Sequence, residues 1–334
     1  MKLAHLSDLH YSTERREEIR WILDHVRYSG AEHLIITGDL TDAGSDVQMR
    51  GLFTLLESAG YGDTESLTVI PGNHDLYGFI YQTFDNPHGV LGNVRGVRSL
   101  VTATRKILEF RKRLLAYSSA DYDSSLANFS RYYGSAFDGV IRMSGQSNFP
   151  FIKLLPGDLA LIGIDSNFCL PRTYGLANTL YYARHAIRSH DITLLGENLS
   201  GSTGWIDIPS LETALSHPAV RHRKKIVLLH HCLYDFAHLA LHTSLPYAME
   251  MRLTNRDDVA RILTAHAVDL VLHGHEHTTE SYHVIGGVRV LNGGGAFSGR
   301  FHVIDSIGPM IRVHRRDSVG GESHSSCDHE TARP

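Results

Sequence analysis

The first 75 residues alternate short apolar runs with amphipathic segments, and this alternation restricts the fold more than any other feature of the chain. The apolar runs cover residues 3–6, 33–37 and 67–70, and they have the length of buried strands. A strand-helix-strand-helix-strand order predicts a parallel sheet joined by right-handed crossovers. We therefore expect an α/β fold at this end of the chain.

The segments between these strands place apolar residues at helical spacing. We expect Ser12 or Thr13 to cap the first helix and Asp46 to cap the second. The side chains expected to face inward are Ile19, Ile22, Leu23 and Val26 in the first helix, and Val47, Leu52, Leu55 and Leu56 in the second. Further along, the pattern predicts a β-hairpin over 151–164 and a helix near 255–266.

Each of the three N-terminal strands ends in a polar cluster. The clusters are Asp8-Leu9-His10, Gly38-Asp39 and Gly72-Asn73-His74-Asp75. The carboxyl ends of parallel strands meet at the edge where open α/β sheets bind ligands, so we expect the three clusters to lie close together. Within the third cluster, the Asp75 carboxylate is expected to hold the imidazole of His74.

Two more clusters end apolar strands in the second half of the chain, namely His230-His231 and Gly274-His275-Glu276-His277. Carboxylate, imidazole and amide oxygen suit divalent ions such as Mn, Fe, Zn or Co, and no thiolate is needed. A carboxylate such as Asp39 is able to bridge two cations about 4 Å apart. Five clusters that each close an apolar strand favour a metal site over unrelated turns and buried histidines.

Residues beside these clusters have simpler interpretations. Asp42 either accepts a hydrogen bond from a ligand imidazole or caps the turn that follows it. We expect His231 and His273 to be buried side chains rather than ligands, and His5 to need no function. The run Gly293-Gly294-Gly295 lacks the setting of a phosphate-binding loop, and we interpret it as a tight turn near the metals.

The order D-x-H, G-D, G-N-H-D, a later His and G-H-x-H resembles the calcineurin-like metallophosphoesterase superfamily, and the resemblance spans Asp8 to His277. It implies two packed mixed β-sheets flanked by helices, in four layers. It also implies a dinuclear hydrolase with two divalent ions, Mn, Fe or Zn. The implied ligands are Asp8, His10 and His277 for one ion, Asn73, His230 and His275 for the other, and Asp39 as the bridge.

The implied reaction is attack on phosphorus by a hydroxide that bridges the two ions. His74 would donate a proton to the leaving alkoxide or stabilise charge on the phosphate, and Asp75 would orient His74. The wording of the motifs looks most like bacterial cyclic-nucleotide phosphodiesterases. A DNA-end phosphodiesterase and a hydrolase of lipid-linked phosphodiesters or pyrophosphates are alternatives. A protein-binding scaffold with the same fold would show eroded ligands, and none is eroded here.

The partner expected from the sequence is a phosphate-ester substrate. A net charge of -4 and a pI near 6.6 argue against a stable nucleic-acid partner. Three scattered cysteines do not form a disulfide framework, and the first ten residues do not resemble a signal peptide. We therefore expect a cytoplasmic protein, with peripheral membrane contact left open and the oligomeric state unspecified.

We expect one metallophosphoesterase domain over residues 1–314, with an insertion at about 77–150 and a disordered tail at 315–334. Within the insertion, a helix is expected at roughly 97–117. Its basic run, Arg111-Lys112-Arg113, is either a solvated face or a wall that attracts an anionic substrate.

Overall fold

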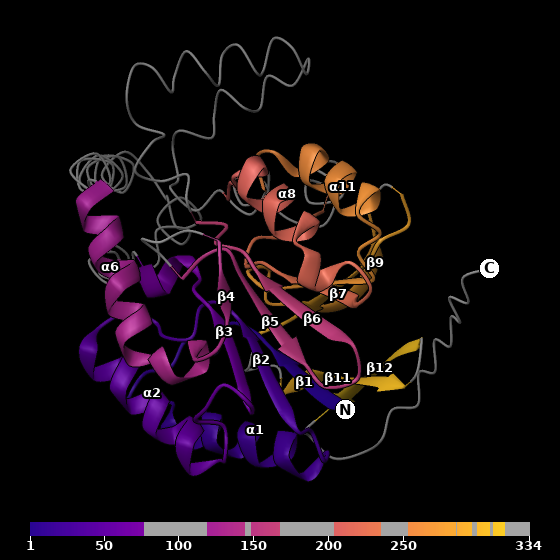
Figure 1. Ribbon diagram of the computed structural model, residues 1–334. Coiled ribbons are helices and arrows are strands. Elements are labelled where there is room, and N and C mark those ends of the chain that lie inside the picture. The colour runs from indigo at the N-terminus through magenta and orange to yellow at the C-terminus, as the bar shows by residue number, and fades with distance from the viewer. Residues whose placement is uncertain are drawn as a thin grey trace, which may run out of the picture.

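The computed structural model describes residues 1–76, 119–143, 148–167, 204–234, 253–284, 286–295, 299–307 and 310–317. Two mixed β-sheets pack together between helices, which confirms the expected fold class (Figure 1). The expected basic helix at 97–117 lies outside the described residues. Among the described helices, none combines the length and the apolar character needed to cross a membrane.

The first sheet has the strand order β12-β11-β1-β2-β3. Its strands are β1 (Lys2–Leu6), β2 (His33–Thr37), β3 (Leu67–Ile70), β11 (Arg300–Ile307) and β12 (Met310–Asp317). β1, β2 and β3 are parallel, as expected, and β11 pairs antiparallel with β1. β12 continues to Asp317, so residues 315–317 belong to the sheet rather than to the expected tail.

The second sheet has the strand order β4-β5-β6-β7-β8-β10-β9. Its strands are β4 (Ile141–Arg142), β5 (Phe151–Leu155), β6 (Leu159–Gly163), β7 (Lys224–Leu228), β8 (Leu270–His273), β9 (Thr279–His283) and β10 (Arg289–Gly293). β5 and β6 form the expected hairpin. β6, β7, β8 and β10 are parallel, so their carboxyl ends lie at one edge.

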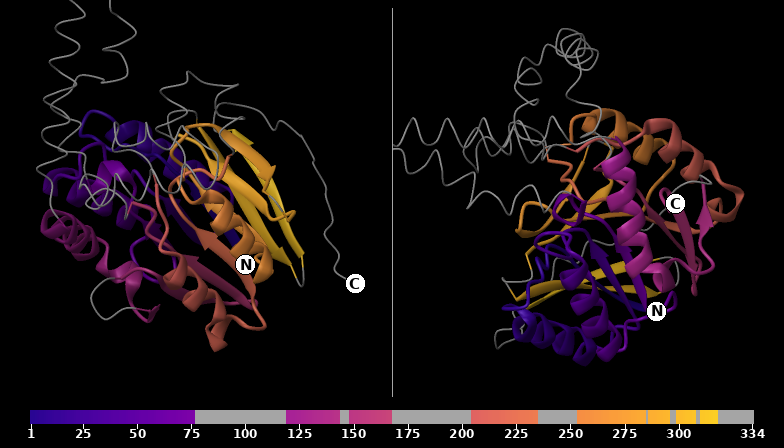
Figure 2. Two further views of the ribbon diagram at one scale, coloured as in Figure 1. Left: turned by 90° about the horizontal axis from the view of Figure 1, so that it is seen from above. Right: turned by 90° about the vertical axis from the view of Figure 1, so that its left-hand side faces the viewer.

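Helices cover both outer faces of the two sheets (Figures 1 and 2). α1 (Arg16–Tyr28) and α2 (Asp46–Ser58) lie on one side, and α8 (Ile208–Ser216) and α11 (Arg256–Ala265) lie on the other. Two short 3₁₀ helices are η1 (Gly134–Phe137) and η5 (Pro218–Val220). α6 (Ser119–Tyr132), which the sequence did not predict, packs beside α2 and buries Phe129 in the hydrophobic core to which α1, α2 and the first sheet also contribute.

Alternation along the strands of the second sheet separates two hydrophobic cores. Leu161 and Leu228 belong to the core between the two sheets, whereas Ile162 and Val227 face the core under α8 and α11. Strands that are buried on both faces read as continuous apolar runs, and that is why they stood out in the sequence.

The first helix starts later than expected. Ser12 and Thr13 form a turn, and their carbonyls accept hydrogen bonds from the N–H groups of Arg15 and Arg16 at 3.2 and 3.4 Å. Arg15 is the N-cap, without a side-chain capping bond. The Arg15 guanidinium instead donates to the carbonyls of Leu9 and His10, so this residue connects the helix to the loop after β1.

The cap of α2 also differs from the expectation. Ser45 takes this position, and its hydroxyl accepts a hydrogen bond from the N–H of Gln48, so Asp46 is the first helical residue instead. Val47 was expected inside but is 73% exposed, and Met49 is buried in its place. Val47 lies five residues before Leu52, and that spacing puts the two on different faces of a helix.

Lys153 of β5 connects the two sheets from inside the core. Its side chain is almost fully buried, and its Nζ donates to the carbonyls of Thr64, Leu67 and Ala136 at 3.0, 2.6 and 2.7 Å. Burial lowers the pKa of the Lys153 amine to about 7. Leu67 belongs to β3, the edge strand of the other sheet. No neighbouring strand donates a hydrogen bond to the Leu67 carbonyl on that side, and Lys153 supplies the donor instead.

We expect Lys153→Met to lower the free energy of unfolding by about 2–3 kcal/mol, because buried carbonyls lose their donor. Lys225→Met is the matched control, since Lys225 Nζ donates to one carbonyl, that of His266, at 2.9 Å. The control should lose less than about 1 kcal/mol. Urea unfolding measures both variants. Equal losses would show that Lys153 does not support the edge of β3.

Candidate metal centre

The loops after five strands, from both sheets, meet at one site. Each loop begins at the carboxyl end of its strand, and the structure brings all seven predicted ligands together. They are Asp8 and His10 after β1, Asp39 after β2, Asn73 after β3, His230 after β7, and His275 and His277 after β8. The convergence that the parallel topology predicted for the three N-terminal clusters is therefore confirmed, and the loops after β7 and β8 of the second sheet join them.

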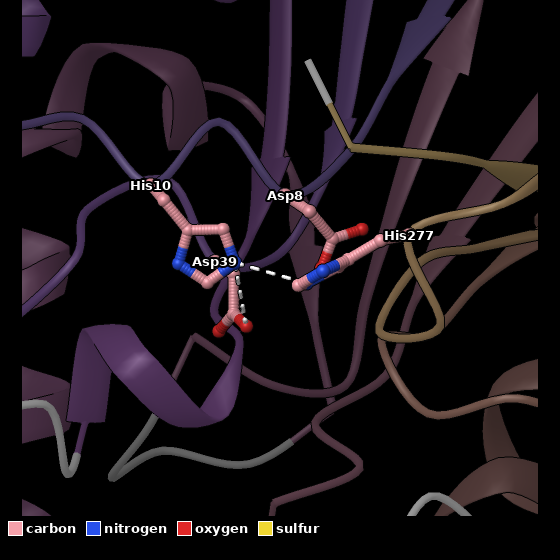
Figure 3. A group of neighbouring side chains, drawn as sticks. All are labelled: Asp8, His10, Asp39 and His277. Carbon is pink, nitrogen blue, oxygen red and sulfur yellow. Dashed lines mark hydrogen bonds and ion pairs between the residues drawn. The ribbon is translucent and has the colours of Figure 1, made fainter. Parts of the chain in front are cut away.

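The first group of side chains consists of Asp8, His10, Asp39 and His277 (Figure 3). His10 Nε2 lies 3.1 Å from His277 Nε2 and 3.7 Å from Asp39 Oδ2. His277 Nε2 lies 3.5 Å from Asp8 Oδ1. Two ring nitrogens and two carboxylates therefore face a common centre. This arrangement suits a divalent cation with nitrogen and oxygen ligands.

The second group consists of Asn73, His230 and His275, again with Asp39. His230 Nε2 lies 3.1 Å from Asn73 Oδ1, 3.2 Å from His275 Nδ1 and 3.4 Å from Asp39 Oδ2. Asp39 Oδ2 is thus close to a histidine of each group. The carboxylate stands where a ligand shared by two cations is required.

A backbone carbonyl fixes the tautomer of His230. The Nδ1 of this ring lies 2.9 Å from the carbonyl oxygen of Thr37, at the end of β2. A carbonyl only accepts hydrogen bonds, so Nδ1 carries a proton and Nε2 is the nitrogen that faces the site. Metal-binding histidines ordinarily have such a partner on their second nitrogen.

Backbone strain is concentrated at the site. Within the described residues, seven residues other than glycine have positive φ, and five of them are predicted ligands. The five are Asp8 (53°), His10 (41°), Asp39 (49°), His275 (75°) and His277 (58°). Side chains other than glycine adopt this region at an energetic cost, and such residues cluster at functional sites.

The protonation states of the site suit a cation. Burial opposes ionisation of Asp39, but the imidazoles of His230, His74 and His10 together hold its pKa well below the usual range. Burial lowers the pKa of His10 and of His275, so both rings are neutral and have a lone pair to offer. Burial also opposes the charge on His230, but the Asp39 carboxylate outweighs it and raises the pKa of His230 to about 9, so a cation bound there would displace a proton. The donor set therefore fits two divalent cations.

Two glycines allow the loops to approach each other. A Cβ on Gly274 would lie 1.7 Å from Ser7 Oγ, and one on Gly72 would lie 2.1 Å from Asp39 Oδ1. Contacts this short exclude any larger residue without movement of the backbone. Gly274 thus lets the β8 loop pack on the β1 loop, and the N–H of His275 donates to both oxygens of Asp8 at 3.0 Å.

The expected pairing of Asp75 with the ring of His74 is wrong. The Asp75 carboxylate accepts hydrogen bonds from the N–H groups of Gly72, Leu40 and Thr41 at 2.9, 3.1 and 2.9 Å, and from the Thr41 hydroxyl at 2.9 Å. Asp75 therefore joins the loops after β2 and β3. The Asp75 carboxylate is buried, and its two oxygens already accept four hydrogen bonds. It is therefore unsuited to hold the imidazole of His74.

The partner of His74 is Asp42. His74 Nδ1 lies 2.8 Å from the backbone carbonyl of Asp42, and the Asp42 carboxylate lies 4.0 Å from the same nitrogen and 3.9 Å from His10 Nδ1. The ring of His74 stands edge-on to that of His10 at 4.6 Å. The Asp42 carboxylate faces both imidazoles but lies beyond hydrogen-bonding distance of each, so its expected role as acceptor for a ligand imidazole stays a prediction.

The histidines that we expected to be buried are buried. His273 Nε2 lies 2.7 Å from the Tyr282 hydroxyl, and burial lowers the pKa of His273 to about 3, so this ring is neutral. His5 Nε2 lies 2.8 Å from the Thr37 hydroxyl. Ring packing places His231 beside His275, with centroids 4.5 Å apart.

Ser166 is a site residue that the sequence reading missed. Its hydroxyl oxygen accepts hydrogen bonds from the N–H groups of His230 and His231 at 3.2 Å, and it lies 2.8 Å from His231 Nδ1. Ser166 follows β6, the parallel neighbour of β7. A polar residue after a parallel strand was the available signal, but the hairpin reading of 151–164 obscured it.

A family model for calcineurin-like phosphoesterases matches residues 1–279. The chain belongs to the calcineurin-like phosphoesterase family. The match covers every ligand described above, from Asp8 to His277. Members of this family are phosphoesterases, so the enzyme class expected from the motifs is confirmed.

Solved structures show the same fold in other phosphoesterases. A dimetal phosphatase from Danio rerio matches with a TM-score of 0.54 and 13% identity over 96% of each chain. A purple acid phosphatase from yellow lupin seeds matches with a TM-score of 0.52 and 11% identity. The match covers 96% of the protein described here and 52% of the lupin chain. A sequence comparison with curated proteins gives no match.

We expect Asp39→Ala to abolish binding of both ions, because the shared carboxylate is lost from each group. Metal analysis of dialysed protein should fall from two ions per chain to less than one. Asp42→Asn is the matched control, since this carboxylate lies in the same loop and faces one of the same rings, that of His10, without joining either ligand group. Two ions retained in Asp39→Ala would refute the bridging role.

We expect Asp75→Asn to lower the free energy of unfolding by about 2–3 kcal/mol. The NH₂ group of asparagine would face backbone N–H groups that need an acceptor, so buried donors would lose their hydrogen bonds. Thr41→Val removes one of the four hydrogen bonds and should lose about 1 kcal/mol. Thermal and urea unfolding of the metal-free protein measure the free energy of unfolding of both variants. If Asp75→Asn had unchanged stability and altered only the pH profile of activity, the result would support the expected pairing of Asp75 with His74.

Proposed function

We propose that this enzyme is a phosphodiesterase that works with two divalent metal ions. The observation that carries the proposal is the position of Asp39, whose Oδ2 lies 3.7 Å from a nitrogen of one ligand group and 3.4 Å from a nitrogen of the other. Sharing of one buried carboxylate by two sets of nitrogen and oxygen ligands is the arrangement that a dinuclear centre needs.

Two divalent ions, when bound, supply Lewis acidity and make hydroxide available at neutral pH. The residues of the chain do the rest. Asp8, His10 and His277 would hold one ion, Asn73, His230 and His275 would hold the other, and Asp39 would join them. The carboxylates of Asp8 and Asp39 are fixed by backbone N–H groups, so the ligands need little rearrangement before substrate binds.

His74 is the proposed proton donor. Its side chain is partly exposed beside His10, whereas the ligands Asp8 and Asp39 are buried. Since Nδ1–H is donated to the Asp42 carbonyl, Nε2 is the nitrogen that would exchange a proton with the substrate. As the new P–O bond forms and the ester P–O bond breaks, the departing alkoxide would take that proton.

Cyclic nucleotides are the substrate class that we propose. Support comes from the wording Ser7-Asp8-Leu9-His10, Thr37-Gly38-Asp39-Leu40-Thr41-Asp42 and Pro71-Gly72-Asn73-His74-Asp75, which looks most like bacterial cyclic-nucleotide phosphodiesterases. Opening of a cyclic diester expels a ribose alkoxide, which is a poor leaving group. A proton donor such as His74 is useful for that reaction.

A substrate panel tests the proposal. It contains bis(p-nitrophenyl) phosphate, cyclic nucleotides, DNA with free ends, phospholipids and nucleotide-linked lipids, each assayed with Mn²⁺ and with Zn²⁺. Turnover of cyclic nucleotides well above the other classes is expected. Preference for DNA ends or for a lipid-linked substrate would support those alternatives. Failure to bind metal or to turn over any diester would favour the scaffold reading.

We expect His74→Ala to leave metal content unchanged and to slow diesters with alkoxide leaving groups by about 10²–10³-fold. The p-nitrophenyl diester should lose less than about tenfold, because p-nitrophenolate leaves without a proton. Steady-state rates on matched methyl and p-nitrophenyl diesters measure the difference. Equal losses on both substrates would argue against proton donation.

A further inference from the structure

A chain of hydrogen bonds joins the two loops that carry His230, His275 and His277. Tyr282 lies on β9, and its hydroxyl oxygen lies 3.0 Å from the N–H nitrogen of Leu233 and 2.7 Å from His273 Nε2. His273 Nδ1 in turn lies 2.8 Å from the carbonyl oxygen of Gly274. No ligand belongs to this chain of bonds, but Gly274 at one end directly precedes His275, and Leu233 at the other end lies three residues after His230.

The direction of every bond in this chain is determined. The Gly274 carbonyl only accepts, so His273 Nδ1 carries a proton. Nε2 of the neutral ring is then an acceptor, and the Tyr282 hydroxyl donates to it. The remaining bond is donated by the Leu233 N–H to the Tyr282 oxygen. Each donor in this network has one acceptor, so the side chains of His273 and Tyr282 are held in a single arrangement.

This chain of bonds controls the spacing of the two loops. Leu233 lies three residues after His230, and Gly274 immediately precedes His275. The N–H of Gly274 also donates to the carbonyl of His230 at 3.0 Å, which extends the β7–β8 ladder by one step. The loops are thus joined directly at the ladder and indirectly through Tyr282.

We infer that Tyr282 is a positioning residue for the metal centre: its hydroxyl sets the distance between the His230 and His275 imidazoles. The inference rests on the two-metal function proposed above. The ion bound by these two histidines draws one ligand from each loop. The other ion takes Asp8 and His10 from the loop after β1 and only His277 from the β8 loop, and the hydrogen bonds described for Tyr282 do not reach the β1 loop. Loss of the hydroxyl should therefore weaken one ion more than the other.

Tyr234 provides a matched control. Its ring stacks on that of Tyr282 with centroids 4.0 Å apart, and its hydroxyl lies 2.5 Å from Glu280 Oε2, also on β9. Tyr234→Phe therefore removes a hydroxyl from the same aromatic pair. It leaves the bonds from Tyr282 to Leu233 and His273 in place.

The experiment is a Mn²⁺ titration of the full-length wild type, Tyr282→Phe and Tyr234→Phe, with affinities from calorimetry and the coupled ion pair followed by electron paramagnetic resonance. We expect the wild type and Tyr234→Phe to bind two ions alike. Tyr282→Phe should bind one ion about 10-fold more weakly and should show less of the coupled signal. This is the low end of the loss seen when a ligand loses its own hydrogen-bond partner, because Tyr282 acts through residues that lie near the ligands along the chain. The other ion should change by less than about threefold.

Each result has one meaning. Two equally tight ions in the wild type and in Tyr282→Phe would overturn the inference and leave the two-metal proposal intact. A wild type that binds fewer than two ions would contradict the proposed function itself. Equal weakening of both ions, or equal effects of the two tyrosine variants, would indicate a general loosening and overturn the inference. If Tyr282→Phe does not fold, His273→Gln breaks the same chain and should give the same selective loss.

Discussion

A single buried carboxylate, that of Asp39, determines how the two sheets must meet. One of its oxygens accepts the N–H of His74 at 2.8 Å, and the other faces His10 on one side and His230 on the other. His10 and His230 come from different sheets. The edges of both sheets must therefore lie within reach of one side chain, and this requirement explains why polar bonds between the sheets are placed so close to the site.

Polar bonds within each sheet and between the two sheets form a scaffold around the ligands. Asp75 joins the loops after β2 and β3, and Ser166 fixes the backbone at His230. Asn167, next to Ser166, donates to the carbonyl of Pro71 at 3.0 Å and so connects the β6 loop of one sheet to the β3 loop of the other. Each bond satisfies a buried group that would otherwise destabilise the fold. Stability and site geometry therefore depend on the same contacts.

The sequence revealed the ligands because each follows a buried apolar strand, and parallel strands present their carboxyl ends at one edge. It did not reveal α6, although Tyr122, Leu126 and Phe129 recur there at helical spacing, because Ser, Asp and Asn between them are weak helix formers. Nor did it reveal the partner of His74, since nearness along the chain suggested Asp75. Side chains of adjacent residues point in different directions, and only the packed loops show which groups meet.

The ligand loops are cross-linked by protein contacts alone. Asp8 accepts the N–H of His275, and Asp39 accepts the N–H of His74, so each carboxylate is held by the backbone of a different loop. Positive φ angles at five ligands would relax if these loops were free to move. These backbone conformations persist because the stabilisation from the surrounding hydrogen bonds is larger than their energetic cost. The same hydrogen bonds hold both carboxylates at the positions where the cations would bind, so the chain's own contacts contribute to the shape of the site.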